Sequence, residues 1–225
     1  ALADYLSSTE ITKPFFIRIN PMNTSHGEKD INIFKETVKS FKGLIIPKIE
    51  DPVEIASLNK EIKVVLLIET PLALENLSLL SQSDNVIGLA LGGADLSAEL
   101  GSDMSWDSLL MARSMIVLQA SKNGLLTIDS PFMQINDEKL LAEESWKAKS
   151  IGFNSKFAIH PKQAKIIKER FLPTKEEIEE AEKIIEAYSN SKGGAISVDG
   201  KMVDEPIVRL MKKRLWLVGI DLESK

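Results

Sequence analysis

The sequence contains no cysteine. This absence excludes disulfides, thiolate zinc sites, iron–sulfur clusters and cysteine nucleophiles, and it fits a reducing cytoplasm. The sequence also has no apolar run long enough to span a membrane. The best candidate, Val64–Ile68, stops at Glu69 and has the length of a strand. Residues Ala1–Tyr5 lack the charged and apolar regions of a signal peptide. They also lack an initiating Met, so we expect the sequence to start partway along a longer chain.

An excess of basic charge is absent too. The chain has 28 basic and 33 acidic residues, a net charge of −5, and no basic run suited to nucleic acid. With 44% hydrophobic and 27% charged residues, the composition is typical of globular proteins. The 225 residues fit one large α/β domain or two small ones.

Short apolar runs alternate with segments of helical periodicity. The runs are almost continuously hydrophobic, which is typical of parallel strands covered on both faces. Strands separated by helices of this size form right-handed βαβ units. The predicted strands are residues 15–20, 43–48, 63–69, 86–91, 125–129 and 155–160, and the predicted helices between and after them are residues 31–41, 106–122, 139–149 and 161–171.

A polar group follows nearly every predicted strand. An open doubly wound sheet binds ligands at one switch point, whereas a barrel builds its site from all the strand ends, so the pattern favours the barrel. A closed barrel typically needs about 250 residues. We therefore predict an α/β fold: a TIM-like (β/α)8 barrel lacking its first two βα units, which would lie before residue 1. Residues 1–172 form this partial barrel and residues 173–225 a C-terminal extension.

The extension has its own signals. Thr174 and Glu177 form a capping box for a helix running to about Asn190, and Gly193-Gly194 breaks it. Residues 196–204 indicate a hairpin-like strand or loop that turns at Asp199-Gly200. A last helix is expected over residues 205–218. This segment is long enough to act as a lid or to pack on a neighbouring subunit.

Two carboxylates stand out at strand ends. Glu69 terminates a very apolar strand, and Asp95 follows Gly92-Gly93 just beyond the next one. A carboxylate in such a place is costly unless it is paired or bound to a metal. Because neighbouring strands lie about 4.8 Å apart, both can reach one magnesium ion, which typically keeps waters and substrate oxygens as its other ligands. A salt bridge, or a helix N-cap by Asp95, is the structural alternative.

Three further side chains have more than one interpretation. Arg18 interrupts an apolar strand and suits carboxylate or enolate binding, or it lies along the rim with a solvated head. Lys48 either forms a Schiff base or, as we favour, pairs with Glu50 or Glu69. His160 is a base, a metal ligand or, as we favour, a rim residue beside a nucleotide pocket.

The ordered set of strand-end motifs resembles the citrate lyase β-subunit-like family of the HpcH/HpaI aldolase superfamily. Each motif is weak alone, but the set covers nearly the whole chain in family order. The matching stretches are Ile17–Asn20, Pro47–Glu50, Ile68–Thr70, Leu91–Leu96, Ala112–Ser114, Ile159–Gln163, Pro173-Thr174 and Val198–Asp204.

The resemblance implies a TIM-like barrel assembled as a trimer or higher homo-oligomer. It implies a magnesium-dependent lyase that cleaves or forms 3-hydroxyacyl thioesters, such as citryl-, citramalyl- or malyl-coenzyme A, or their acyl carrier protein counterparts. Glu69 and Asp95 would bind magnesium and Arg18 would stabilise the enolate oxygen. Asp204, from a neighbouring subunit, would transfer a proton. The Ile159-His160-Pro161 stretch would contribute to the site of the thioester carrier.

The sequence departs from the family at its start. Members begin with a strand carrying a Pro-Gly-x-x-Pro-like turn and then a strand ending in an Asp-Leu-Glu-Asp-like motif, and neither is present. Two alternatives therefore stay open. One is a magnesium-dependent aldolase acting on free hydroxy-keto acids, and the other is a catalytically reduced binding subunit.

Overall fold

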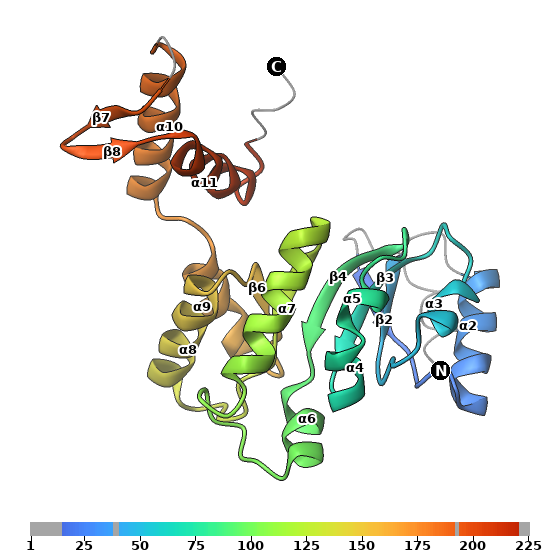
Figure 1. Cartoon of the computed structure of the whole chain (residues 1–225). Coiled ribbons are helices and arrows are strands. Elements are labelled where there is room, and N and C mark those ends of the chain that lie inside the picture. Colours follow the sequence, from blue (N-terminus) through green and yellow to red (C-terminus); the bar gives the residue numbers. More distant parts are fainter. Residues whose placement is uncertain (1–14, 38–40, 192–193, 221–225) are drawn as a thin grey trace. The chain divides into compact units, whose positions relative to one another are not determined.

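The computed structural model describes residues 15–37, 41–191 and 194–220 (Figure 1). The chain divides into two compact units, residues 1–163 and 164–225. No helix within the described ranges is long and apolar enough to cross a membrane. The predicted division at residues 172 and 173, and packing of the extension on a neighbouring subunit, stay predictions.

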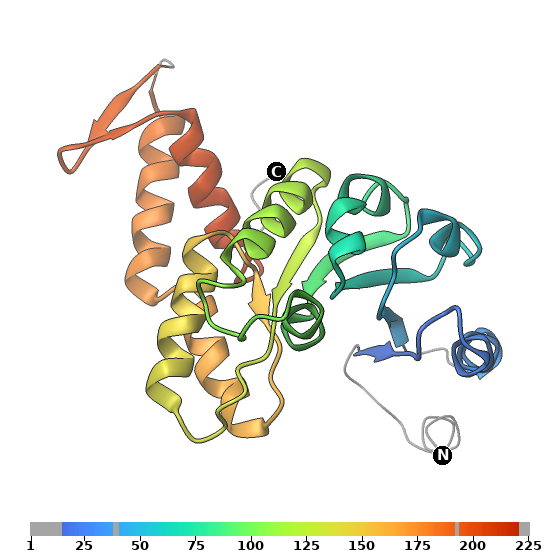
Figure 2. The ribbon, with the colours of Figure 1, turned by 60° about the horizontal axis from the view of Figure 1, so that its bottom comes forward.

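The first unit contains one six-stranded sheet. All its strands are parallel and lie side by side in chain order. The sheet is curled like half of a barrel (Figure 2). The predicted parallel α/β architecture is thus confirmed, while a closed eight-stranded barrel stays a prediction. The strands are β1 (Phe15–Arg18), β2 (Phe41–Ile46), β3 (Lys63–Ile68), β4 (Val86–Leu91), β5 (Leu126–Asp129) and β6 (Ser155–Lys156).

Helices follow the strands as βαβ units require. The helix predicted over residues 31–41 begins earlier, at Ser25, because the Thr24 hydroxyl accepts a hydrogen bond from the Gly27 amide. It ends at Thr37, and Phe41 pairs with Phe15 in the sheet. The helices of this part of the chain are α2 (Ser25–Thr37), α3 (Pro52–Ala56), α4 (Pro71–Glu75), α5 (Leu77–Leu80), α6 (Gly93–Leu100), α7 (Leu110–Asn123), α8 (Glu138–Ser150) and α9 (Pro161–Phe171).

Both faces of the sheet are apolar. The pairing register aligns Ile45 with Val65, and Leu67 with Ala90, on one face, where they form a hydrophobic cluster. Alternate residues such as Leu66 point to the opposite face, where α7 packs against β4 and β5. Burial on both sides explains why the strands are almost continuously hydrophobic.

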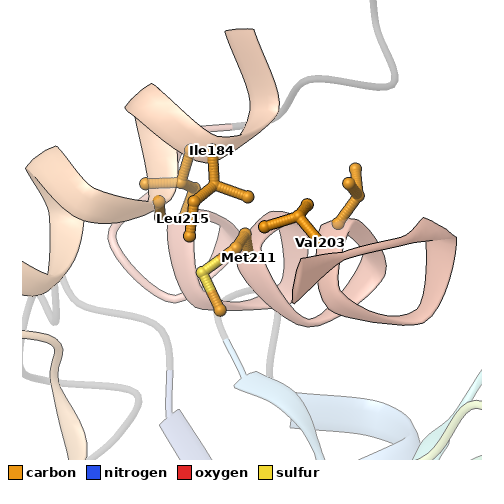
Figure 3. Close-up of a cluster of buried hydrophobic side chains, with 6 residues drawn as sticks. Ile184, Val203, Met211 and Leu215 are labelled. Carbon is orange, nitrogen blue, oxygen red and sulfur yellow. The ribbon is translucent and has the colours of Figure 1, made fainter. Parts of the chain in front are cut away.

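The second unit begins within α9 and contains α10 (Lys175–Ser189), α11 (Glu205–Trp216) and a hairpin of β7 (Ile196–Val198) and β8 (Lys201–Val203). The predicted capping box is confirmed, because Thr174 and Glu177 exchange hydrogen bonds. The predicted hairpin is confirmed as well, with positive φ at both turn residues. The hydrophobic core of the second unit consists of Ala181, Ile184, Val203, Val208, Met211 and Leu215 (Figure 3).

Candidate functional site

Glu69 lies at the carboxyl end of β3 and is almost completely buried, with 1% of its surface exposed. Its position two residues after Leu67 directs it to the face of the sheet that carries the Val65–Leu67 cluster. Its Oε1 accepts a hydrogen bond of 2.9 Å from the backbone N–H of Lys48, which follows β2. One carboxylate oxygen is therefore fixed by the neighbouring strand end.

Gly92 gives Glu69 the room it occupies. The Gly92 amide donates a 2.8 Å hydrogen bond to the Ile68 carbonyl, which continues the pairing of β3 and β4 beyond the last strand residue. A Cβ on Gly92 would lie 2.3 Å from Glu69 Cβ and 2.5 Å from Glu69 Oε2. The missing side chain is thus needed for the carboxylate to lie against β4.

Asp95 stands in the first turn of α6, the helix that follows β4. The N-cap of this helix is Gly92, so the alternative that Asp95 serves as an N-cap is wrong. The Asp95 side chain is 46% exposed, and its Oδ1 lies 3.6 Å from the ammonium nitrogen of Lys48. The salt-bridge alternative therefore holds for Asp95, which pairs with the Lys48 ammonium. Glu69 instead accepts a hydrogen bond from the Lys48 backbone.

The two carboxylates are close enough to affect each other. Burial raises the pKa of Glu69 above its ordinary value, and the negative charge of Asp95 raises it further. The Lys48 hydrogen bond and the positive charges of Arg18 and Lys48 act in the opposite direction without cancelling the increase. A buried carboxylate destabilised by a second one is the arrangement that a bound cation relieves.

Arg18 completes the group from β1. The register aligns Arg18 with Ile45 and Ile45 with Val65, so all three side chains lie on the face of Glu69. Arg18 is exposed, and with Asn20, Pro47 and Lys48 it lines a hollow of about 370 Å³. Its positive charge is close enough to lower the pKa of Glu69.

The donor set fits a magnesium ion. Within the described residues, no group of three or more His, Asp and Glu side chains forms a metal site. Magnesium does not need one, because one or two carboxylates with waters and substrate oxygens are its usual ligands. The Lys48 ammonium already stands beside Asp95 as a cation. Glu69 and Asp95 are the residues that would hold the ion.

The predicted carrier stretch forms the turn into α9, which begins at Pro161. The Ile159 amide donates to Oε1 of the buried Gln163, whose Nε2 donates to the Phe132 carbonyl. His160 Nδ1 accepts from the Lys162 amide at 3.2 Å. The turn is thus fixed by Gln163, a residue whose role the sequence did not reveal.

Asp204 belongs to the second unit, directly after β8. It is the N-cap of α11, and its Oδ1 accepts a 3.4 Å hydrogen bond from the Ile207 amide. Its proton-transfer role stays a prediction.

A buried charge network also escaped the sequence reasoning. The Asp129 carboxylate, at the end of β5, receives hydrogen bonds from Arg113 Nε at 2.8 Å and Lys156 Nζ at 2.6 Å. Lys156 also contacts Glu144, and the Arg113 guanidinium lies over the Trp106 ring. The pairing register puts Asp129 beside Lys156, one position from the inward-facing Ile128. The network therefore joins the sheet to α7 and α8. The sequence offered Arg113 within the Ala112–Ser114 motif, but nothing in it paired Arg113 with Asp129.

Comparisons with known proteins place this geometry in context. The family model described as HpcH/HpaI aldolase/citrate lyase matches residues 1–161. The mitochondrial citramalyl-CoA lyase of Rattus norvegicus is 29% identical over 220 residues, which cover 86% of this chain and 65% of that relative. The citrate lyase subunit beta of Haemophilus influenzae is 28% identical over 213 residues, covering 85% of this chain and 72% of that protein.

A solved structure is similar over almost the whole chain. CitE from Mycobacterium tuberculosis, crystallised with magnesium, acetoacetate and coenzyme A, superposes with a TM-score of 0.80 at 27% identity. The match covers 97% of this chain and 83% of that one. The chain therefore spans most of the CitE structure, but less than two thirds of the length of the rat lyase.

Proposed function

The chain belongs to the HpcH/HpaI aldolase/citrate lyase family, and we propose that it acts as a magnesium-dependent carbon–carbon lyase. Its substrate would be a 3-hydroxyacyl thioester such as citryl-, citramalyl- or malyl-coenzyme A, or the acyl carrier protein counterpart. Cleavage would give an acyl thioester and an α-keto acid. The names of the rat and Haemophilus relatives and the ligands of the CitE crystal support this class of reaction.

One observation supports the proposal: the charges of Asp95, Arg18 and Lys48, which come from or follow three neighbouring strands, all act on the buried carboxylate of Glu69. Arg18 follows from β1, Lys48 from β2, Glu69 from β3 and Asp95 from α6 after β4. Catalytic groups of barrel enzymes come from the carboxyl ends of several strands. Structural salt bridges alone do not account for burying Glu69 with a raised pKa beside a second acid.

The residues have separate roles in this reaction. Magnesium, when bound by Glu69 and Asp95, would supply Lewis-acid polarisation of a substrate oxygen. Arg18 would stabilise the negative charge that develops on the thioester oxygen when the carbon–carbon bond breaks, because a guanidinium is permanently charged and donates several hydrogen bonds. Asp204 of a neighbouring subunit would move the proton.

The wider assembly is part of the same proposal. Two further βα units would complete the six described strands as a (β/α)8 barrel, and residues 173–225 would act as a lid on a neighbouring subunit of a trimer or hexamer. The Ile159-His160-Pro161 turn would bind the coenzyme A or acyl carrier protein part of the substrate. Because its amide is taken by Gln163, Ile159 would contribute other groups. We propose a cytoplasmic location from the cysteine-free composition.

A substrate panel tests the proposal. The purified chain is incubated with magnesium and citryl-, citramalyl- or malyl-coenzyme A, or with free hydroxy-keto acids, and the products are identified by mass spectrometry. We expect one substrate to give an acyl-coenzyme A and a keto acid, with the reaction lost in EDTA and in Asp95→Asn. Cleavage only of free hydroxy-keto acids would indicate the aldolase instead. Magnesium binding without any turnover would indicate a binding subunit.

A further inference from the structure

Lys48 combines two features that a simple ion pair does not need. Its backbone has φ of +50°, in the left-handed region that L-residues with a side chain avoid. Only one other described non-glycine residue, Asp199, shares a positive φ, and that residue sits in a hairpin turn. Strain of this kind persists where the surrounding structure requires it, and it gathers at functional sites.

The backbone amide of Lys48 holds Glu69. That amide donates the 2.9 Å hydrogen bond to Oε1 of Glu69, the one contact that fixes this oxygen from the neighbouring strand end. The other oxygen, Oε2, lies against Gly92. The backbone of Lys48 thus sets the direction in which the buried carboxylate presents itself.

The side chain of Lys48 reaches the second carboxylate. Its ammonium stands 3.6 Å from Asp95 Oδ1, and both side chains are about half exposed, at 50% and 46%. At this distance and exposure the pair is weak, because solvent screens it. A divalent cation bound by the Asp95 carboxylate would repel the ammonium that stands beside that carboxylate.

We propose that Lys48 is a positioning residue whose backbone favours metal binding and whose side chain disfavours it. Its backbone fixes Glu69, and its ammonium is a resident countercation that magnesium must displace from Asp95. The inference rests on the proposed function, since it needs Glu69 and Asp95 to be the metal ligands. Its consequence is that the side chain of Lys48 weakens metal binding even though the residue organises the site.

The test compares metal affinity among variants of the full chain. Mn²⁺, which accepts the same oxygen ligands as magnesium, is titrated and its free signal followed by electron paramagnetic resonance, with Mg²⁺ as competitor. Lys48→Met removes the charge and keeps the length, whereas Lys48→Gly removes the charge and adopts the positive φ without strain. Lys48→Arg keeps the charge as the matched control. Asp95→Asn reports on the metal site itself.

We expect Lys48→Met and Lys48→Gly to bind Mn²⁺ about fivefold more tightly than the parent chain, from the repulsion of a divalent ion and an ammonium in screened water. Lys48→Arg should stay near the parent affinity. The gain should shrink between about 0.01 M and about 0.15 M KCl, because salt screens charges. A purely structural role would not produce this salt dependence.

Two different failures can be told apart. If Asp95→Asn abolishes Mn²⁺ binding while both uncharged Lys48 variants bind equally or more weakly than the parent, the inference is overturned and the metal site stands. If Asp95→Asn binds Mn²⁺ like the parent, the proposed metal site is wrong and the inference is lost with it.

Discussion

Replacing Gly92 with alanine tests whether the site is built by close approach of β3 and β4. Gly92 has φ of −93° and ψ of 70°, so alanine meets no left-handed strain there. The added Cβ would lie 2.3 Å from Glu69 Cβ and 2.5 Å from its Oε2, against ordinary contacts of 3.4–4 Å. The Glu69 side chain would therefore have to move by about 1 Å.

Moving Glu69 should lower both the stability of the fold and the affinity for the metal. Glu69 is buried, and its Oε1 is held by the Lys48 amide, so the shift must break that bond or displace a strand end. Overpacking of this size destabilises proteins by about 1–3 kcal/mol. Disturbing the residues that orient a metal ligand typically lowers metal affinity by about 10–100-fold.

The assay separates the two effects. Urea denaturation measures the free energy of unfolding, and the Mn²⁺ titration measures metal affinity. Gly101→Ala is the matched control, because Gly101 has φ of +64° and no atom within 4 Å of an added Cβ. It should lose about 1–2 kcal/mol through its backbone alone and keep its metal affinity. If Gly92→Ala and Gly101→Ala bind Mn²⁺ equally well, the reasoning about Gly92 and Glu69 is refuted.

Three further predictions concern other parts of the chain. Arg113→Met leaves Asp129 buried with one cation fewer and should lower the free energy of unfolding, measured by urea denaturation, by about 3–5 kcal/mol. Lys165→Met removes an exposed ion pair and should change that free energy by less than about 1 kcal/mol. Similar losses in the two variants would contradict the role of the buried network. Glu69→Gln should raise the free energy of unfolding at pH 7. The raised pKa means that the folded state disfavours the ionised carboxyl, so native Glu69 loses stability as the pH rises from the ordinary value of 4.5 through the folded pKa. The advantage of the variant should vanish below pH 4.5, and a variant less stable at pH 7 would contradict this cause. Asp204→Ala should lose turnover with unchanged Mn²⁺ affinity, and about 1 kcal/mol of stability as the N-cap of α11. Asp204→Asn keeps a good cap, so retained turnover in either variant would rule out proton transfer by this residue.

The site was predicted from the sequence in part. Glu69 and Asp95 were selected because each ends or follows an apolar run, and Arg18 because it interrupts one; parallel strands bring their carboxyl ends to one edge. The structure shows Glu69 to be buried and the charges of Asp95 and Arg18 to act on it, while a shared metal site stays a prediction. Neither the left-handed backbone of Lys48 nor the contact of Gly92 with Glu69 was predicted, because both depend on how neighbouring strand ends approach in space.

Local patterns by themselves determined the order of strands and helices, the capping box at Thr174 and the turn at Asp199-Gly200, since each depends on residues a few positions apart. Only the tertiary structure decided which charges meet. Asp129 and Lys156 are 27 positions apart, and the pairing register of β5 and β6 makes them neighbours. Glu69 likewise meets the Lys48 amide across 21 positions, because side-by-side parallel strands join segments that an intervening helix separates in the chain.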